Sequence, residues 1–150
     1  MQQPTLKLEI FEGPLDLLLS LVHKNKMNIN DISVKKYTVA DKDSAVNLGS
    51  GGLNVFGTPA LVAKMEQTAL EMVRPDLDAN SDTVGIEINV KHVKATAIGK
   101  TVTVEAKIVN IDGRKICFEI TATDEAGDVI GTAYHERFVV DKQRFMSKLQ

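Results

Sequence analysis

The chain has 150 residues, of which 43% are hydrophobic and 25% charged, a balance typical of one soluble domain with a buried core. Its formal net charge of −2 and its lack of a Lys/Arg block argue against a nucleic-acid partner, and no apolar run approaches the roughly 20 residues that span a membrane. A single cysteine, Cys117, excludes an internal disulfide framework and favours a reducing, cytoplasmic setting. The first residues do not have the pattern of a secretory signal.

The first 33 residues form a part of their own. Residues 6–12, LKLEIFE, alternate like a short strand. Residues 14–24 then show the i, i+3, i+4, i+7 spacing of an amphipathic helix, carried by Leu15, Leu18, Leu19 and Val22. The pattern predicts a strand–helix appendage that ends near residue 33.

From residue 34 onward the pattern becomes one helix followed by several strands. Residues 34–39, VKKYTV, alternate like a strand, and a polar loop with several glycines leads into a helix that ends near Val73. Four extended segments follow, with every second residue apolar, over about 86–90, 102–108, 116–120 and 130–140. Asp112–Gly113 is a hairpin signal between two of them. One long helix and an antiparallel meander predict an α+β domain, and a sheet wrapped around one central helix is the hotdog fold.

Glu66 interrupts the apolar face of the predicted helix. On a helical wheel it lies roughly 40° from Val62, within a stripe formed by Met65, Ala69 and Val73, so we expect it to face the sheet. The opposite side of the wheel gathers Lys64, Gln67, Thr68 and Glu71. A buried carboxylate without a partner is costly. Glu66 is therefore either a structural residue, bound by backbone N–H groups or a lysine, or part of a functional site.

Thr58 and His92 are predicted to face the same helix–sheet interface as Glu66. Thr58 precedes Pro59, and this pair suits the N-cap and first position of a helix. Capping alone explains Thr58; alternatively, the N–H groups of the helix start hold a reacting carbonyl oxygen. His92 shares strand parity with Ile86 and is either a satisfied core histidine or a catalytic one. Together the three side chains form a set that can activate a hydroxyl or a water.

Two further residues have weaker signals. Arg137, in HERF near the end of the last strand, suits a substrate phosphate or carboxylate, although an exposed surface cation is the default interpretation. Cys117 has the opposite parity from the apolar residues around it, and we interpret it as an unreactive packing residue.

Four segments together, VFGTPALVAKMEQTALE, TVGIEINVKHVKATAIGKTVTVEA, IDGRKICFEI and HERFVVD, resemble the fluoroacetyl-CoA thioesterase-like family of hotdog proteins, over about residues 34–145. The resemblance implies hydrolysis of an acyl-CoA to a free acid and CoA, with catalytic Thr58, Glu66 and His92, an acyl-lining Gly85 and a substrate-contacting Arg137. His92, oriented by Glu66, would activate either water or Thr58.

The same resemblance implies a cytoplasmic homodimer, or a higher oligomer built from it, with acyl sites at the subunit interface and with no cofactor and no metal. The loop NLGSGGLN differs from the aromatic-rich lid of the family's fluoroacetate enzyme. The acyl group therefore stays open, and we expect a short one.

Residues 6–33, LKLEIFEGPLDLLLSLVHKNKMNINDIS, instead resemble the opening of a bacterial kleisin, segregation and condensation protein A. The sequence thus predicts a kleisin-like segment over 1–33 and a hotdog thioesterase domain over 34–150. Two other functions stay open: a hotdog protein that binds acyl-CoA without hydrolysing it, and a chromosome-segregation adaptor that acts through the N-terminal segment. If the thioesterase domain is independent, a chain that begins at Val34 keeps its activity.

Overall fold

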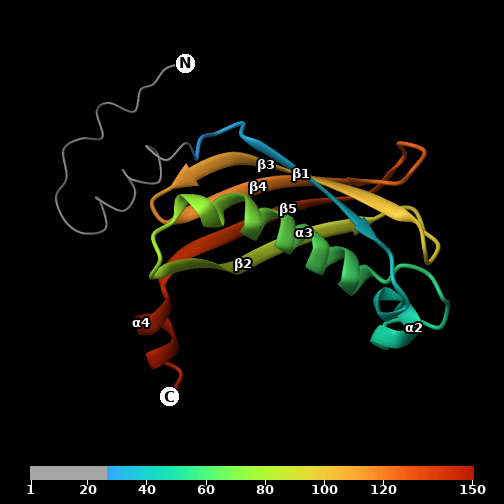
Figure 1. Cartoon of the computed structure of the whole chain (residues 1–150), viewed down its shortest axis with the longest axis horizontal. Coiled ribbons are helices and arrows are strands. Elements are labelled where there is room, and N and C mark those ends of the chain that lie inside the picture. Colours follow the sequence, from blue (N-terminus) through green and yellow to red (C-terminus); the bar gives the residue numbers. More distant parts are fainter. Residues whose placement is uncertain (1–26) are drawn as a thin grey trace.

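The computed structural model describes residues 27–150, so the strand predicted over 6–12 and the helix predicted over 14–24 lie outside the described residues. A five-stranded antiparallel sheet has the strand order β1-β3-β4-β5-β2. One long helix, α3 (Thr58–Val73), lies across one face of this sheet (Figure 1). The strands are β1 (Ile32–Thr38), β2 (Ser81–His92), β3 (Thr101–Asp112), β4 (Lys115–Thr123) and β5 (Val129–Asp141). This arrangement confirms the predicted α+β hotdog architecture.

Four short elements were beyond the reach of sequence periodicity, because each contains fewer than two turns of helix. They are η2 (Asp41–Asp43), α2 (Ala45–Leu48), η3 (Arg74–Asp76) and α4 (Lys142–Ser147). Local capping defines the two α-helices: Ser44 caps the start of α2, and Asp141 accepts a hydrogen bond from the Arg144 N–H at the start of α4. Figure 1 shows α4 pointing away from the sheet.

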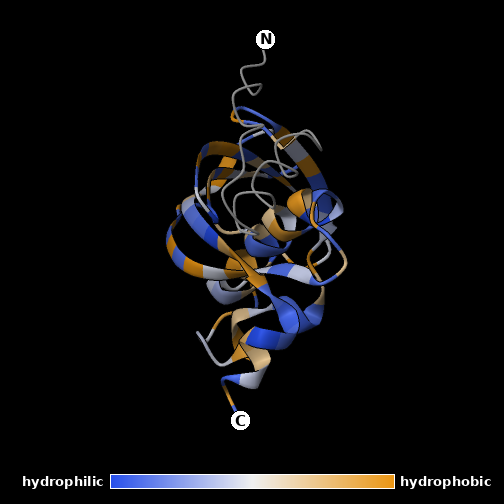
Figure 2. Ribbon diagram, turned by 90° about the vertical axis from the view of Figure 1, so that its left-hand side faces the viewer, coloured by the Kyte–Doolittle hydropathy of each residue, from blue (hydrophilic) through white to orange (hydrophobic). Residues whose placement is uncertain are grey.

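The core lies between α3 and the sheet. Hydropathy alternates along the strands in Figure 2, as the period of two in a half-buried strand requires. The predicted alternation on β3 and β4 is confirmed by the buried residues Val102, Val104, Ala106, Ile108, Ile116, Phe118 and Ile120. Cys117, of opposite parity, is also buried, with its Sγ 3.8 Å from a carboxylate oxygen of Glu136.

The buried stripe of α3 centres on Met65 rather than on Val62. Leu61 and Met65 have no solvent exposure, whereas Val62 is only half-buried. Thr68, expected on the exposed side, is 1% exposed. Its burial is tolerated because its hydroxyl donates to the Lys64 carbonyl and bonds the Tyr37 hydroxyl. Glu66 therefore lies at the edge of the stripe, half-buried and not at its centre.

Residues just before the predicted domain joint pack on the sheet. Met27 is 1% exposed within the core, and the Asn30 N–H donates to the Ile108 carbonyl at 2.7 Å. The Ile108 N–H in turn donates to the Asp31 carbonyl at 3.0 Å. The predicted joint between residues 33 and 34 falls inside β1, so the described segment before it contributes to the folded domain.

We expect a chain that begins at Val34 to be less stable than one that begins at Met27. Loss of a buried methionine side chain alone costs about 2–5 kcal/mol, and the start of β1 is lost with it. Equilibrium urea unfolding of both chains measures the difference. A chain that begins at Met27 and carries Ile29→Ala, at a position 51% exposed, is the control. Equal unfolding free energies for the two starting points would contradict the expectation.

Candidate active site

A β-bulge in β2 decides which of its residues face α3. The pairing with β5 passes from Gly85 to Glu87, so Ile86 is an extra residue. Ile86 is 51% exposed, and the prediction that it faces the apolar side is wrong. Because the bulge shifts the alternation by one residue, Gly85 before it and His92 after it both face α3.

The first polar cluster joins Thr58 to His92 at the start of α3. Gly57, in extended conformation, occupies the N-cap position, and Thr58 is the first helical residue. The prediction that Thr58 caps the helix is therefore wrong, and its hydroxyl makes no capping bond. The Thr58 Oγ1 instead lies 2.7 Å from the His92 Nδ1, so the structure brings these two predicted site residues together.

His92 has the environment of a neutral base. Burial lowers the pKa of its imidazole, and the edge of Phe56 packs against the ring with centroids 6.2 Å apart. If Nδ1 accepts the Thr58 O–H, the ring proton is on Nε2. This Nε2 is buried and has no hydrogen-bond partner within residues 27–150. His92 can therefore accept the Thr58 proton while it presents a second, unused N–H.

A pocket of about 320 Å³ opens at this pair, lined among others by Phe56, Gly57, Thr58 and His92. The Gly57 N–H donates to the Asp43 carbonyl, Pro59 has no N–H, and from Ala60 onward the N–H groups donate back to preceding carbonyls. In the described part of the chain, the Thr58 N–H is therefore the backbone donor at the helix start that has no carbonyl acceptor. Its position at the positive end of the helix dipole suits a substrate carbonyl oxygen.

The second polar cluster surrounds Arg137, which is 6% exposed; the interpretation as a surface cation is wrong. Its Nε donates to the Thr83 Oγ1 at 2.8 Å and its Nη2 to the Thr83 carbonyl at 3.1 Å. Its Nη1 lies 3.1 Å from the His135 Nε2. Burial lowers the pKa of Arg137, and the charge of Glu66 opposes that shift.

Gly85 provides the space that Glu66 occupies. A Cβ at Gly85 would lie 2.8 Å from the Glu66 Oε2 and 3.5 Å from the Arg137 Nη1. A side chain there would displace the carboxylate at the end of the flexible Glu66 side chain. Gly85 thus lies against Glu66 and Arg137, and whether Gly85 and Arg137 also contact the substrate stays a prediction.

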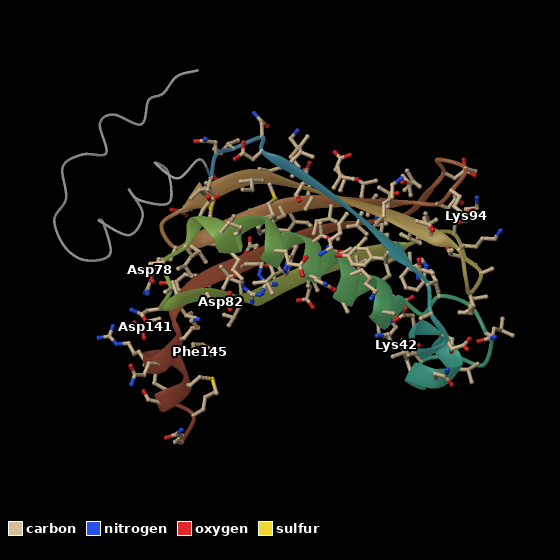
Figure 3. The ribbon with its side chains drawn as sticks, viewed as in Figure 1. Lys42, Asp78, Asp82, Lys94, Asp141 and Phe145 are labelled. Atoms are coloured by element: carbon tan, nitrogen blue, oxygen red, sulfur yellow. The ribbon has the colours of Figure 1, made fainter. Side chains whose placement is uncertain are left out.

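The two clusters are separate within one chain. Eight residues of helix place Thr58 and Glu66 about 12 Å apart along the axis. Figure 3 shows that the two ends of β2 lie well apart: Asp82, near its start, is toward one end of the molecule, and Lys94, just beyond its end, is at the other. From the sequence we expect Glu66 to orient His92, but within one chain the structure does not bring these two side chains together.

His135 is the site residue that the sequence interpretation overlooked. It has no solvent exposure, and its ring stacks on Phe118 with centroids 6.0 Å apart. Its parity offered a signal, because His135 and Arg137 alternate in register with the apolar residues Ala133 and Val139. Burial, followed by a weaker effect of the Arg137 charge, lowers the pKa of His135.

The fold and the hydroxyl–imidazole pair at a helix start define a class, the hotdog thioesterases. A hot-dog-like protein from Thermanaerovibrio acidaminovorans, 21% identical, has a TM-score of 0.74 and covers 81% of this chain and 89% of its own. That likeness identifies the fold.

A sequence model of the family described as fluoroacetyl-CoA-specific thioesterase matches residues 39–143. The fluoroacetyl-CoA thioesterase of Streptantibioticus cattleyicolor is 34% identical over 96 residues, 64% of this chain and 68% of that protein. The solved structure of the fluoroacetyl-CoA thioesterase FlK has a TM-score of 0.78 and 28% identity, and the match covers 82% of this chain and 95% of that one. A mutant of FlK in complex with fluoroacetate and CoA has a TM-score of 0.75 and 28% identity, over 79% of this chain and 99% of that one. The chain belongs to this family and is a thioester hydrolase.

A second likeness is much shorter. The segregation and condensation protein A of Lactiplantibacillus plantarum is 41% identical over 63 residues, which is 41% of this chain and 25% of that protein. Because the match covers only a quarter of that protein, it does not show that this chain has that protein's activity. No helix within residues 27–150 is long and apolar enough to span a bilayer. In the same range, no group of three or more His, Cys, Asp or Glu side chains is arranged to bind a metal ion.

We expect Gly85→Ala to reduce kcat by about tenfold or more, because displacement of a catalytic group by about 1 Å can cost up to about 100-fold. Steady-state hydrolysis of an acyl-CoA measures the loss. Asn110→Ala, at an exposed position of β3, is the control. Unchanged kcat in the Gly85→Ala enzyme would show that the position of the Glu66 carboxylate is irrelevant to the reaction.

His135, which is buried, and His92, which is half-buried, predict a pH dependence of stability. The pKa values of His92 and His135 lie below the ordinary value of about 6.5, so in this range the unfolded chain binds protons that the folded chain does not. Stability therefore rises with pH through this window. Acidification from about pH 7.5 to about pH 5.5 is expected to lower the free energy of unfolding in urea, and His135→Gln is expected to weaken the dependence. A free energy that stays constant or rises on acidification would contradict it.

Proposed function

We propose that the chain hydrolyses a short acyl-CoA and that Thr58 and His92 carry out the chemistry. The contact of 2.7 Å between the Thr58 Oγ1 and the His92 Nδ1 is the observation that carries this proposal. The name of the Streptantibioticus cattleyicolor relative and the FlK complex with fluoroacetate and CoA support an acyl-CoA substrate.

The geometry favours Thr58 as the nucleophile. His92 removes the hydroxyl proton as the Thr58 Oγ1 attacks the thioester carbonyl carbon, and the Thr58 N–H stabilises the resulting oxyanion. Collapse breaks the C–S bond, and the proton passes from His92 to the CoA sulfur. The acyl ester on Thr58 is then hydrolysed by a water that His92 deprotonates, which releases the free acid and restores the hydroxyl.

The alternative is direct attack by water, with the Thr58 hydroxyl holding that water for His92. Acid-quenched turnover analysed by mass spectrometry separates the two. The nucleophile route predicts an acyl adduct on Thr58. Rapid hydrolysis without any adduct would support the water route instead, as would a Thr58→Ser enzyme that keeps its activity but shows no burst of CoA release.

A short acyl group suits the pocket. Its volume of about 320 Å³ is near the lower end of ligand pockets, which span about 300–1,000 Å³, and part of that space must hold the pantetheine arm. We place the enzyme in the cytoplasm because its single cysteine, Cys117, fits a reducing compartment.

We further propose that the active unit is a homodimer, or a higher oligomer built from it, joined through the β2 edges. β2 is an edge strand of 12 residues, and unpaired edges are natural pairing surfaces. Antiparallel pairing of β2 with its copy, centred on Asn89 and with Ile86 left out of the pairing as it is against β5, sets His92 opposite the partner's Gly85. The partner's Glu66 would then lie close to the unpartnered His92 Nε2, which supports the orienting role expected of Glu66.

A panel of acyl-CoA thioesters, with free CoA detected by a thiol reagent, tests the function. Thr58→Ala, His92→Ala and Glu66→Gln are each expected to lower kcat at least about 100-fold, the lower range of acid–base catalysis. Asn110→Ala, at an exposed position of β3 away from the β2 edge, should match the parent. If the parent binds acyl-CoA but releases no CoA from any thioester of the panel, the protein is a binding protein and the enzymatic proposal fails.

Mixed dimers test the shared site. When Thr58→Ala and Glu66→Gln chains are coexpressed, a heterodimer has one site with both substitutions and one with neither. Random pairing then restores about a quarter of the parent activity from two inactive variants. Sites confined to single chains would give no recovery.

A further inference from the structure

His135 is a buried imidazole whose two ring nitrogens are both engaged. Its Nδ1 lies 2.8 Å from the Glu87 carbonyl oxygen, which can only accept, so Nδ1 carries the proton. Its Nε2 lies 3.1 Å from the Arg137 Nη1, which can only donate, so Nε2 is the acceptor. Both contacts demand the same neutral tautomer, with the proton on Nδ1.

This tautomer completes a one-sided cradle for the guanidinium. Thr83 accepts from Nε and Nη2 of Arg137, and His135 accepts from Nη1. The acceptors come from β2 and β5. The same Nη1 and the Glu66 Oε2 both lie within 4 Å of the point where a Gly85 Cβ would stand. The cradle therefore holds the cation close enough for the charge of Glu66 to act on it.

The charge of the acceptor matters for Glu66. A carboxylate in place of His135 would neutralise the guanidinium and compete with Glu66 for it. A neutral imidazole satisfies one N–H and leaves the full positive charge available. An apolar residue would leave a buried donor without an acceptor. Neutral histidine meets both requirements.

We propose that His135, as its Nδ1–H tautomer, is a positioning residue that aims the Arg137 guanidinium at the Glu66 carboxylate and so fixes Glu66 for its part in thioester hydrolysis. The inference rests on the proposed function for the role of Glu66 in hydrolysis. The geometry of the cradle is independent of that function.

The first test is spectroscopic and needs no activity. In parent protein labelled with ¹⁵N-histidine, long-range ¹H–¹⁵N spectra at about pH 7 should give His135 the pattern of an Nδ1–H tautomer. An Nε2–H tautomer or a protonated ring would overturn the proposal. The ¹³C carboxyl resonance of Glu66 should also shift in His135→Leu and not in Asn110→Ala, an exposed position of β3; an unmoved resonance in His135→Leu would overturn the proposal as well.

The second test is a double-mutant cycle in kcat. His135→Leu should lower kcat by about tenfold with a smaller change in KM, whereas His135→Gln, which keeps an acceptor oxygen, should lose less. In a Glu66→Gln background, His135→Leu should change kcat by less than about twofold, because the carboxylate it helps to position is already gone. Additive losses would show a merely structural role and overturn the proposal. If His135→Leu fails to fold, His135→Gln and Arg137→Lys complete the cycle.

The two tests also separate this inference from the proposed function. A parent without thioesterase activity but with the expected tautomer and the expected Glu66 shift would refute the proposed function and leave the cradle standing. An active parent with the wrong tautomer would refute the positioning role alone.

Discussion

A strand presents alternate residues to opposite faces of its sheet, and β2 departs from this rule once, at Ile86. Seven positions separate Gly85 from His92, so in a regular strand the two would face opposite sides. Because Ile86 is left out of the pairing, both face α3, and the polar groups of the candidate site share one helix–sheet interface. An inserted residue achieves what a substitution cannot, because it re-aims every side chain that follows.

That interface holds groups which a hydrophobic core would exclude. Arg137 and His135 have almost no solvent contact, and their burial is tolerated because Thr83 and the Glu87 carbonyl satisfy their donors. Buried charges held in this way rarely stabilise a protein more than apolar residues of similar volume would. Stability alone therefore does not explain the cluster. A demand for a fixed cation beside Glu66 explains it better.

Local spacing in the sequence predicts the strands, the long helix and the common facing of Thr58 and His92, because each depends on periodicity alone. The bulge at Ile86 cannot be predicted in this way, since an extra residue leaves the composition of a strand unchanged. The neighbours of Glu66 cannot be predicted from local spacing either, because they depend on which strands lie under the helix. His135 was within reach of alternation, but its histidine–arginine contact is a property of packed side chains rather than of spacing.

Each of the two polar clusters lacks a hydrogen-bond partner of the kind that the other contains. When the His92 Nδ1 accepts from Thr58, the His92 Nε2 is a buried donor that has no acceptor among the described residues. At the other end of the same interface, the Glu66 carboxylate has a cation nearby but accepts no hydrogen bond from any described residue. An isolated chain cannot join donor and acceptor, because α3 is rigid and holds them about 12 Å apart. In the proposed dimer, two-fold rotation at the exposed edge of β2 would exchange the ends of the interface, and each donor would then meet an acceptor. In that arrangement, assembly and completion of the site would be the same event, which would give this enzyme a physical reason to work as a pair.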